Sequence, residues 1–156
     1  MTVSLPRPTS GAMDGNTHWF PLRIYYEETD AGQMVYHAAY LKFAERARTE
    51  MMRINGLSHT MLMEDGGLIF TVHSADVRYL RQAKLDDELV VRTQIKGLGG
   101  ASMDMEQRVY RNNNGELGDA VAELDLRIAV VSQEGRPQRI PARLKDVLER
   151  LHDKKG

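Results

Sequence analysis

The chain has 156 residues, a formal net charge of −1 and 28% charged residues. This length is typical of one domain with a sizeable core, and the balance of acids and bases argues against a general nucleic-acid-binding protein. The absence of cysteine excludes disulfides, thiol nucleophiles and cysteine-ligated metal sites, and it fits a cytoplasmic location.

The first 18 residues contain Pro6, Pro8, Gly11 and Gly15 among scattered polar residues. They lack the apolar region of a secretory signal. We therefore expect a flexible tail over residues 1–18 and a single domain over residues 19–152. No stretch approaches the ~20 apolar residues that a membrane-spanning helix needs, so we expect no transmembrane segment.

A strand, a turn and a long helix are predicted next. Residues 19–27 alternate, with Leu22, Ile24 and Tyr26 on one face, as in a half-buried strand. Residues 28–37 are polar and contain a glycine, which favours a turn. Residues 38–54 then follow a helical period. Their apolar stripe consists of Tyr40, Phe43, Ala44, Ala47, Met51 and Ile54.

The rest of the chain reads mainly as strands joined by short turns. Ser58 is placed to cap a short helix that ends near Asp65, and Pro141 to open a final helix. Between them lie four strand-like segments, 68–80, 88–96, 102–111 and 119–131, with a hairpin turn at 112–115. Short connections imply an antiparallel sheet, and the long helix must bury its stripe on that sheet. The fold class is therefore α+β.

The run from Tyr25 to His37 carries the chemistry. It places the carboxylate of Asp30 in a turn that faces a helix N-terminus, where backbone N–H groups are unpaired and the helix dipole is positive. This combination is suited to attacking a carbonyl carbon and stabilising the oxygen that becomes charged.

The block from Tyr25 to Met52 resembles the signature of hotdog-fold acyl-CoA thioesterases of the 4-hydroxybenzoyl-CoA thioesterase family. Within that family it is most similar to the branch associated with the bacterial Tol-Pal envelope system. The resemblance covers roughly residues 20–150. It implies a curved antiparallel sheet wrapped around one central helix, and hydrolysis of acyl-CoA to a free acid and coenzyme A without a metal or redox cofactor.

The resemblance also assigns roles to single residues. Asp30 falls on the catalytic aspartate of the motif Thr-Asp-Ala-Gly, although the pattern alone favours a structural Asx turn. It attacks the thioester carbonyl or activates a water, and the sequence leaves both routes open. The backbone N–H of His37 polarises the thioester oxygen, and its imidazole is suited to assist proton transfer.

Two further residues of this block are implied to belong to the site. Tyr26 lines it, whereas strand alternation alone would place Tyr26 in the core. Gly32 gives the turn its backbone freedom. Glu27 and Glu28 are expected to point into solvent.

Coenzyme A needs cations near the mouth of the site, and Arg78, Arg81 and Lys84 are the candidates. Exposed cations on a solvated face are the commoner explanation for each of them. Where the 4-hydroxybenzoyl branch carries a basic cluster for the nucleotide phosphates, this chain has Gly-Leu-Gly-Gly-Ala at 97–101. Its phosphate contacts must therefore be different or fewer.

Other chemistries find little support. The sequence has no Gly-x-Ser-x-Gly elbow, no His-Glu-x-x-His and no Walker A motif, and its five histidines are dispersed, so no metal site is expected. An enoyl-thioester hydratase of the same fold pairs its Asp and His at a spacing of five, whereas the spacing from Asp30 to His37 is seven. A non-catalytic scaffold that meets acyl carrier protein or envelope components remains a third hypothesis.

We expect a homodimer or homotetramer, because relatives pair their sheet edges and build the active site at the subunit interface. The acyl chain length stays open. So does the carrier, which is either coenzyme A or acyl carrier protein.

Overall fold

The computed structural model describes residues 2–64 and 66–152. One antiparallel sheet with the strand order β1-β2-β4-β5-β6-β3 dominates the structure. Its strands are β1 (Ala12–Asp14), β2 (Thr17–Arg23), β3 (Ile69–Tyr79), β4 (Glu88–Leu98), β5 (Ser102–Asn113) and β6 (Glu116–Val131). The helices are α1 (Ala39–Ile54), α2 (His59–Glu64), α3 (Ala142–Leu151) and the short 3₁₀ helix η1 (Tyr26–Glu28).

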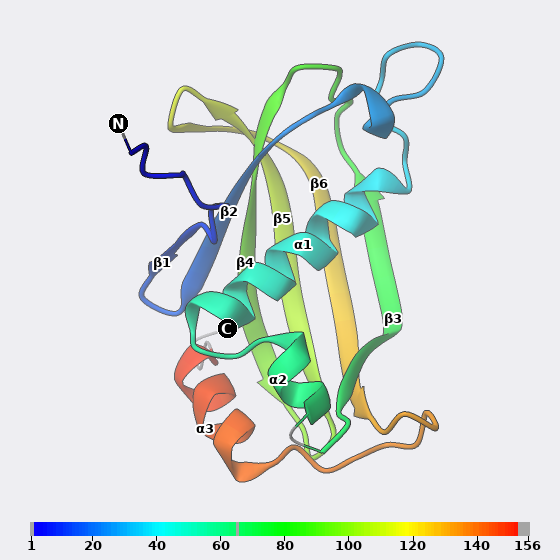
Figure 1. Cartoon of the computed structure of the whole chain (residues 1–156). Coiled ribbons are helices and arrows are strands. Elements are labelled where there is room, and N and C mark those ends of the chain that lie inside the picture. Colours follow the sequence, from blue (N-terminus) through cyan, green and yellow to red (C-terminus); the bar gives the residue numbers. More distant parts are fainter. Residues whose placement is uncertain (1, 65, 153–156) are drawn as a thin grey trace.

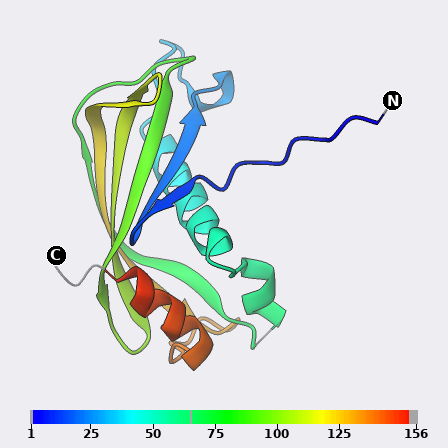
Figure 2. The ribbon, with the colours of Figure 1, turned by 90° about the vertical axis from the view of Figure 1, so that its left-hand side faces the viewer.

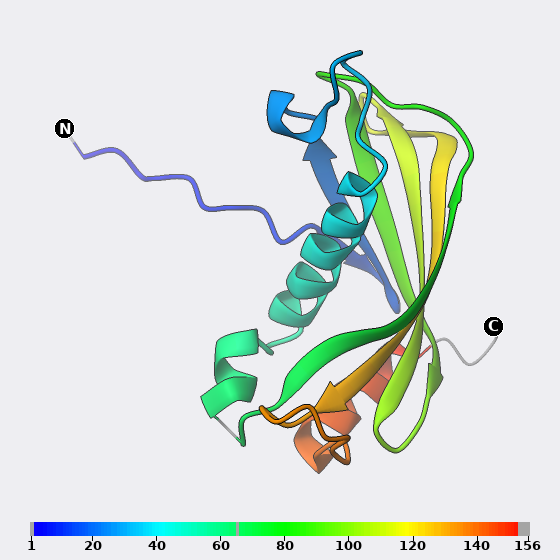
Figure 3. The same ribbon diagram turned by 90° about the vertical axis from the view of Figure 1, so that its right-hand side faces the viewer.

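The helix α1 crosses the concave face of the curved sheet (Figure 1). Side views show the sheet bending around it (Figures 2 and 3). The α+β layering predicted from the sequence is thus confirmed. Each helix is too short or too polar to cross a membrane, as far as the described residues go.

The core forms where the apolar stripe of α1 meets the sheet. Phe43, Ala44, Ala47 and Met51 are fully buried, whereas Ile54, predicted on the same stripe, is 40% exposed. Ile54 is the last residue of α1, beyond the part of the helix that the sheet covers. Burying a large apolar side chain stabilises the fold by about 1.5–3 kcal/mol. The sheet supplies the buried partners Leu89, Val91, Ile95, Met105, Val109 and Leu124.

The N-terminal tail is shorter than predicted. Residues 12–14 form β1, which pairs with the start of β2 through the register Ala12↔Trp19, and His18 is fully buried. The His18 ring Nε2 lies 2.7 Å from the Ser10 carbonyl oxygen. Such a short strand carries too few apolar residues to show alternation, so only its pairing reveals it. Residues 2–11 form neither helix nor strand, and the predicted tail's first residue, Met1, lies outside the described residues.

The first predicted strand, residues 19–27, extends too far at its C-terminal end. β2 ends at Arg23, and Tyr26 begins η1. Tyr26 is therefore 77% exposed instead of sharing the core with Ile24, and Glu28 is buried instead of pointing into solvent. The cause is local, because the Tyr25 backbone N–H donates to Glu28 Oε1 at 3.2 Å and draws that carboxylate inward.

The remaining predicted elements are confirmed with shifts of a few residues at their ends. Ser58 Oγ accepts a hydrogen bond from the Met61 N–H at 3.1 Å, as a cap of α2 would. The predicted end of this helix at Asp65 lies outside the described residues.

The strand β3 lies at one end of the sheet. Among the described residues it pairs only with β6, and residues 71–76 along it are exposed. Exposed strand edges of this length offer unpaired backbone groups to another chain.

Candidate active site

The turn that carries Asp30 is held together by the aspartate itself. Asp30 Oδ1 accepts hydrogen bonds from the backbone N–H groups of Gly32 at 2.9 Å and Met34 at 3.2 Å. The Asp30 N–H donates to the Met34 carbonyl at 2.9 Å, and Gln33 adopts a left-handed conformation with φ 63°. Oδ2 takes part in no hydrogen bond with the described part of the chain. Asp30 therefore forms the Asx turn that the sequence pattern favours, and this turn leaves one carboxylate oxygen available.

Two neighbouring segments fix this turn in place. The Val35 N–H donates to the Ala83 carbonyl at 2.8 Å, and the Leu85 N–H donates to the Gln33 carbonyl at 3.1 Å. On the other side, the Tyr36 N–H donates to the Glu28 carbonyl at 2.9 Å. The Glu28 carboxylate is buried, and its Oε2 has no hydrogen-bond partner among the described residues. These contacts hold the exposed Asp30 carboxyl on an ordered framework.

His37 lies just before α1, whose N-cap is Ala38. Tyr79, the last residue of β3, donates its hydroxyl to the His37 carbonyl at 2.9 Å. The ring of Tyr79 also packs edge-on against Tyr40, with centroids 5.7 Å apart. The His37 N–H donates to no acceptor within the described residues, and it lies at the positive end of the helix dipole. No hydrogen bond joins Asp30 to His37 within one chain.

The other predicted site residues fall in different places. Gly32 is part of the Asp30 turn, where an added Cβ would lie 3.4 Å from Asp30 Oδ1. Lys84 forms a backbone bridge with Met34 and so lies beside this turn. Tyr26 is exposed on η1 at the start of the same loop.

Arg78 and Arg81 are placed less favourably than Lys84 for contacting coenzyme A near the Asp30 turn. Arg81 forms an exposed ion pair with Asp119 at 3.7 Å. Arg78 precedes Tyr79 on β3, and consecutive strand residues point to opposite faces. Because Tyr79 faces α1, Arg78 faces the convex side of the sheet. The structure therefore brings Lys84, but not Arg78, close to the Asp30 turn.

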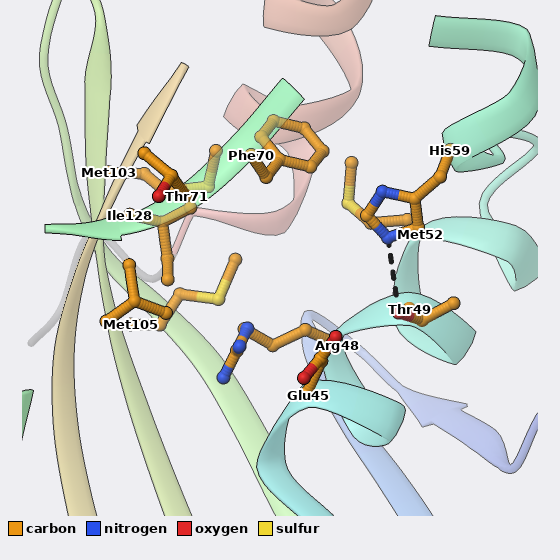
Figure 4. A pocket seen from close by; sticks show the side chains of 11 residues that line it. Glu45, Arg48, Thr49, Met52, His59, Phe70, Thr71, Met103, Met105 and Ile128 are labelled. Atoms are coloured by element: carbon orange, nitrogen blue, oxygen red, sulfur yellow. Dashed lines mark hydrogen bonds between the residues drawn. The ribbon is translucent and has the colours of Figure 1, made fainter. Parts of the chain in front are cut away.

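A cavity of ≈ 230 Å³ lies between α1 and the strands β3, β5 and β6 (Figure 4). None of the predicted site residues lines it. Its walls are Glu45, Arg48, Thr49, Met52, His59, Phe70, Thr71, Val72, Met103, Met105 and Ile128. Sequence reasoning missed this cavity, because its lining comes from segments whose proximity only the folded sheet creates.

The family of this chain follows from its similarity to known proteins. Residues 25–151 match the Thioesterase-like superfamily. The chain belongs to this family. It is 48% identical over 93 residues to the acyl-CoA thioesterase YbgC of Haemophilus influenzae, across 60% of this chain and 68% of that protein. It is 44% identical over 101 residues to the acyl-CoA thioester hydrolase YbgC of Escherichia coli O157:H7, across 65% of this chain and 75% of that protein.

Solved structures show the same fold. A probable thioesterase from Bartonella henselae superposes with a TM-score of 0.74 at 34% identity, covering 80% of this chain and 99% of that one. The 4-hydroxybenzoyl-CoA thioesterase of Pseudomonas sp. strain CBS-3 superposes with a TM-score of 0.76 at 20% identity, covering 84% and 98%; at this identity the likeness concerns the fold alone. The predicted hotdog fold and thioesterase class are confirmed.

Proposed function

We propose that this protein hydrolyses acyl-CoA thioesters to a free carboxylic acid and coenzyme A, with Asp30 as the catalytic carboxylate. The observation that carries the proposal is the Asp30 turn, in which two backbone amides hold Oδ1 and leave Oδ2 available. This turn leads into the N-terminus of α1 in a chain of the thioesterase family. The relatives named acyl-CoA thioesterase supply the substrate class.

The reaction needs a nucleophile on the carbonyl carbon and a donor for its oxygen. Asp30 either attacks this carbon or takes a proton from the attacking water. The His37 N–H, at the positive end of α1, stabilises the oxyanion. The C–S bond then breaks, and the coenzyme A thiolate takes up a proton. Where Asp30 has attacked the carbon directly, water hydrolyses the mixed anhydride that it forms with the acyl group, which releases the free acid and restores the carboxylate. Tyr26 borders the loop and is a candidate to contact the carboxylate or the water.

We further propose that two chains pair through their β3 edges to complete the site. Antiparallel pairing of two identical strands brings the Tyr79 end of one β3 to the Ile69 end of the other. The Tyr79 end holds His37, whereas Phe70 and Val72, near the Ile69 end, line the cavity. Each Asp30 loop then lies near the cavity of the partner chain, which becomes the acyl groove.

Coenzyme A enters from the loop side of this arrangement. Lys84, beside the Asp30 turn, is the best-placed cation for its phosphates. Arg81 is a second candidate and must exchange its exposed ion pair with Asp119 for the ligand. Arg78, on the convex face, is the weakest of the three.

The test is Asp30→Asn, a nearly isosteric change at an exposed turn. Its amide oxygen still accepts the two backbone hydrogen bonds, so the fold should persist. Hydrolysis of a panel of acyl-CoA substrates, followed by release of the thiol, should drop by about 10²-fold or more. Asp146→Asn on the exposed face of α3 is the matched control and should retain wild-type turnover. A folded Asp30→Asn variant with most of the wild-type turnover would refute the assignment.

A further inference from the structure

The most unusual side chain of the cavity is Arg48, which extends from α1 toward the strands beside Met105 (Figure 4). Its guanidinium carries five N–H donors, yet within the described chain only Gln107 Oε1 accepts a hydrogen bond from it, at 3.0 Å. No ion pair of the described residues includes Arg48. Arg48 is half-buried, and a guanidinium removed in part from water is commonly paired with a carboxylate or phosphate.

A buried amide holds this arginine in position. Gln107 on β5 is fully buried, and its Nε2 donates to the Ala44 carbonyl and to Thr93 Oγ1, both at 3.0 Å. These two bonds fix the amide so that Oε1 faces Arg48. A neutral acceptor thus orients the guanidinium without neutralising its charge, and the remaining donors are free for a ligand.

The other polar groups of the cavity compensate this charge only in part. Burial lowers the pKa of Arg48, and the nearby charge of Glu45 acts in the opposite direction, but the guanidinium stays protonated because an arginine is always charged in proteins. Glu45 is exposed, one turn earlier on α1. Thr49 Oγ1 and His59 Nε2 lie 3.1 Å apart and satisfy each other.

We propose that Arg48 binds a carboxylate at the far end of a short acyl group, so that the preferred substrates are thioesters of short dicarboxylic acids. This inference rests on the proposed function. Met52, Phe70, Met105 and Ile128 form apolar walls for the methylene groups. The cavity of ≈ 230 Å³ between these walls has room for a short acyl chain.

The experiment compares glutaryl-CoA with isoheptanoyl-CoA, in which an isopropyl group replaces the carboxylate at equal size. The wild-type chain should show a higher kcat/KM for glutaryl-CoA. Arg48→Met should lower the ratio of the two kcat/KM values by about tenfold to a hundredfold, because hydrogen bonds to charged groups are worth that much. Arg48→Lys should lower it less, since a cation remains without the bidentate fork.

Arg46→Met is the matched control, because Arg46 is an exposed arginine on the same helix that does not line the cavity. Like Arg48→Met, it removes one positive charge from α1, and it should leave the ratio of the two kcat/KM values unchanged. Circular dichroism and oligomeric state must match wild type in every variant. Calorimetric binding of glutaryl-CoA to Asp30→Asn, and to the same variant carrying Arg48→Met, measures recognition without turnover.

The outcomes separate the two proposals. If the chain hydrolyses isoheptanoyl-CoA as well as glutaryl-CoA, or if Arg48→Met leaves the ratio unchanged, Arg48 is a structural residue and this inference is wrong while the thioesterase proposal stands. Absence of hydrolysis for every acyl-CoA refutes the proposed function instead. In that case, glutaryl-CoA binding that does not weaken on Arg48→Met refutes the carboxylate site as well.

Discussion

At the scale of single residues, His37 shows how backbone and side chain have separate tasks. Its carbonyl is held by the Tyr79 hydroxyl at 2.9 Å, and its ring packs against Tyr36 with centroids 4.4 Å apart. These contacts orient the peptide unit before α1, whereas the imidazole itself is exposed. The proposed mechanism uses the main-chain N–H alone.

Two substitutions at His37 test this separation. His37→Ala keeps the N–H and should retain measurable thioester hydrolysis. His37→Pro deletes the donor and should lower kcat by on the order of 10²–10³-fold, the cost of losing one oxyanion donor. Circular dichroism and light scattering must first show that both variants fold and assemble as wild type does. A folded His37→Ala variant as inactive as Asp30→Asn would instead make the imidazole a general acid or base.

At the scale of elements, β3 is the strand whose outer edge is open to pairing with another chain. It joins the Tyr79–His37 contact at one end to the cavity at the other, and its middle residues are exposed. A second β3 is the partner that we propose for this edge.

A charge at Ser74, near the middle of β3, tests this pairing. Ser74 is exposed in one chain, so Ser74→Lys should not affect folding of the monomer. Antiparallel self-pairing brings the two copies of this position close together, where like charges are destabilising. Ser74→Lys should therefore shift the assembly toward monomer at micromolar concentration and reduce hydrolysis, as measured by light scattering and thiol release.

The neutral variant Ser74→Gln serves as the control and should remain assembled and active. The pairing proposal fails if the wild-type chain is an active monomer, or if Ser74→Lys keeps both its assembly and its activity.

At the scale of the whole molecule, His18 connects the N-terminal segment to the stability of the fold. It is fully buried, with Nε2 near the Ser10 carbonyl, and Nδ1 has no hydrogen-bond partner in the part of the chain that the structure describes. Ser10 Oγ in turn donates to Glu50 on α1 at 2.9 Å. Burial lowers the pKa of His18 below 6.5, although the Ser10 hydrogen bond and the Glu50 charge oppose the shift.

This shift predicts how stability depends on pH. The unfolded chain binds a proton at His18 at a higher pH than the folded chain does, so the free energy of unfolding is highest above pH 6.5 and falls as the pH decreases toward the folded-state pKa. His18→Gln removes this term. Urea unfolding at about pH 8 and about pH 5 should show a smaller loss of stability in His18→Gln than in the wild type. Equal losses in both proteins would contradict the prediction.

Much of this architecture could be predicted from local pattern. The period of α1 and the alternation along β4, β5 and β6 follow from side chains a few residues apart, and these patterns repeat often enough to be read. The Asp30 turn is equally local, because its hydrogen bonds span two to four residues. Sequence by itself therefore determined the α+β class, the order of the long elements and the turn that carries the candidate carboxylate.

Only the tertiary structure decided the features that depend on distant segments. Arg48 and Gln107 are 59 residues apart, and Tyr79 meets His37 across 42. The burial of Glu28 and the pairing of β1 have no periodic signal, since each depends on one or two hydrogen bonds. A cavity is what packing leaves between its walls, so the pocket around Arg48 exists only once α1 lies on the curved sheet.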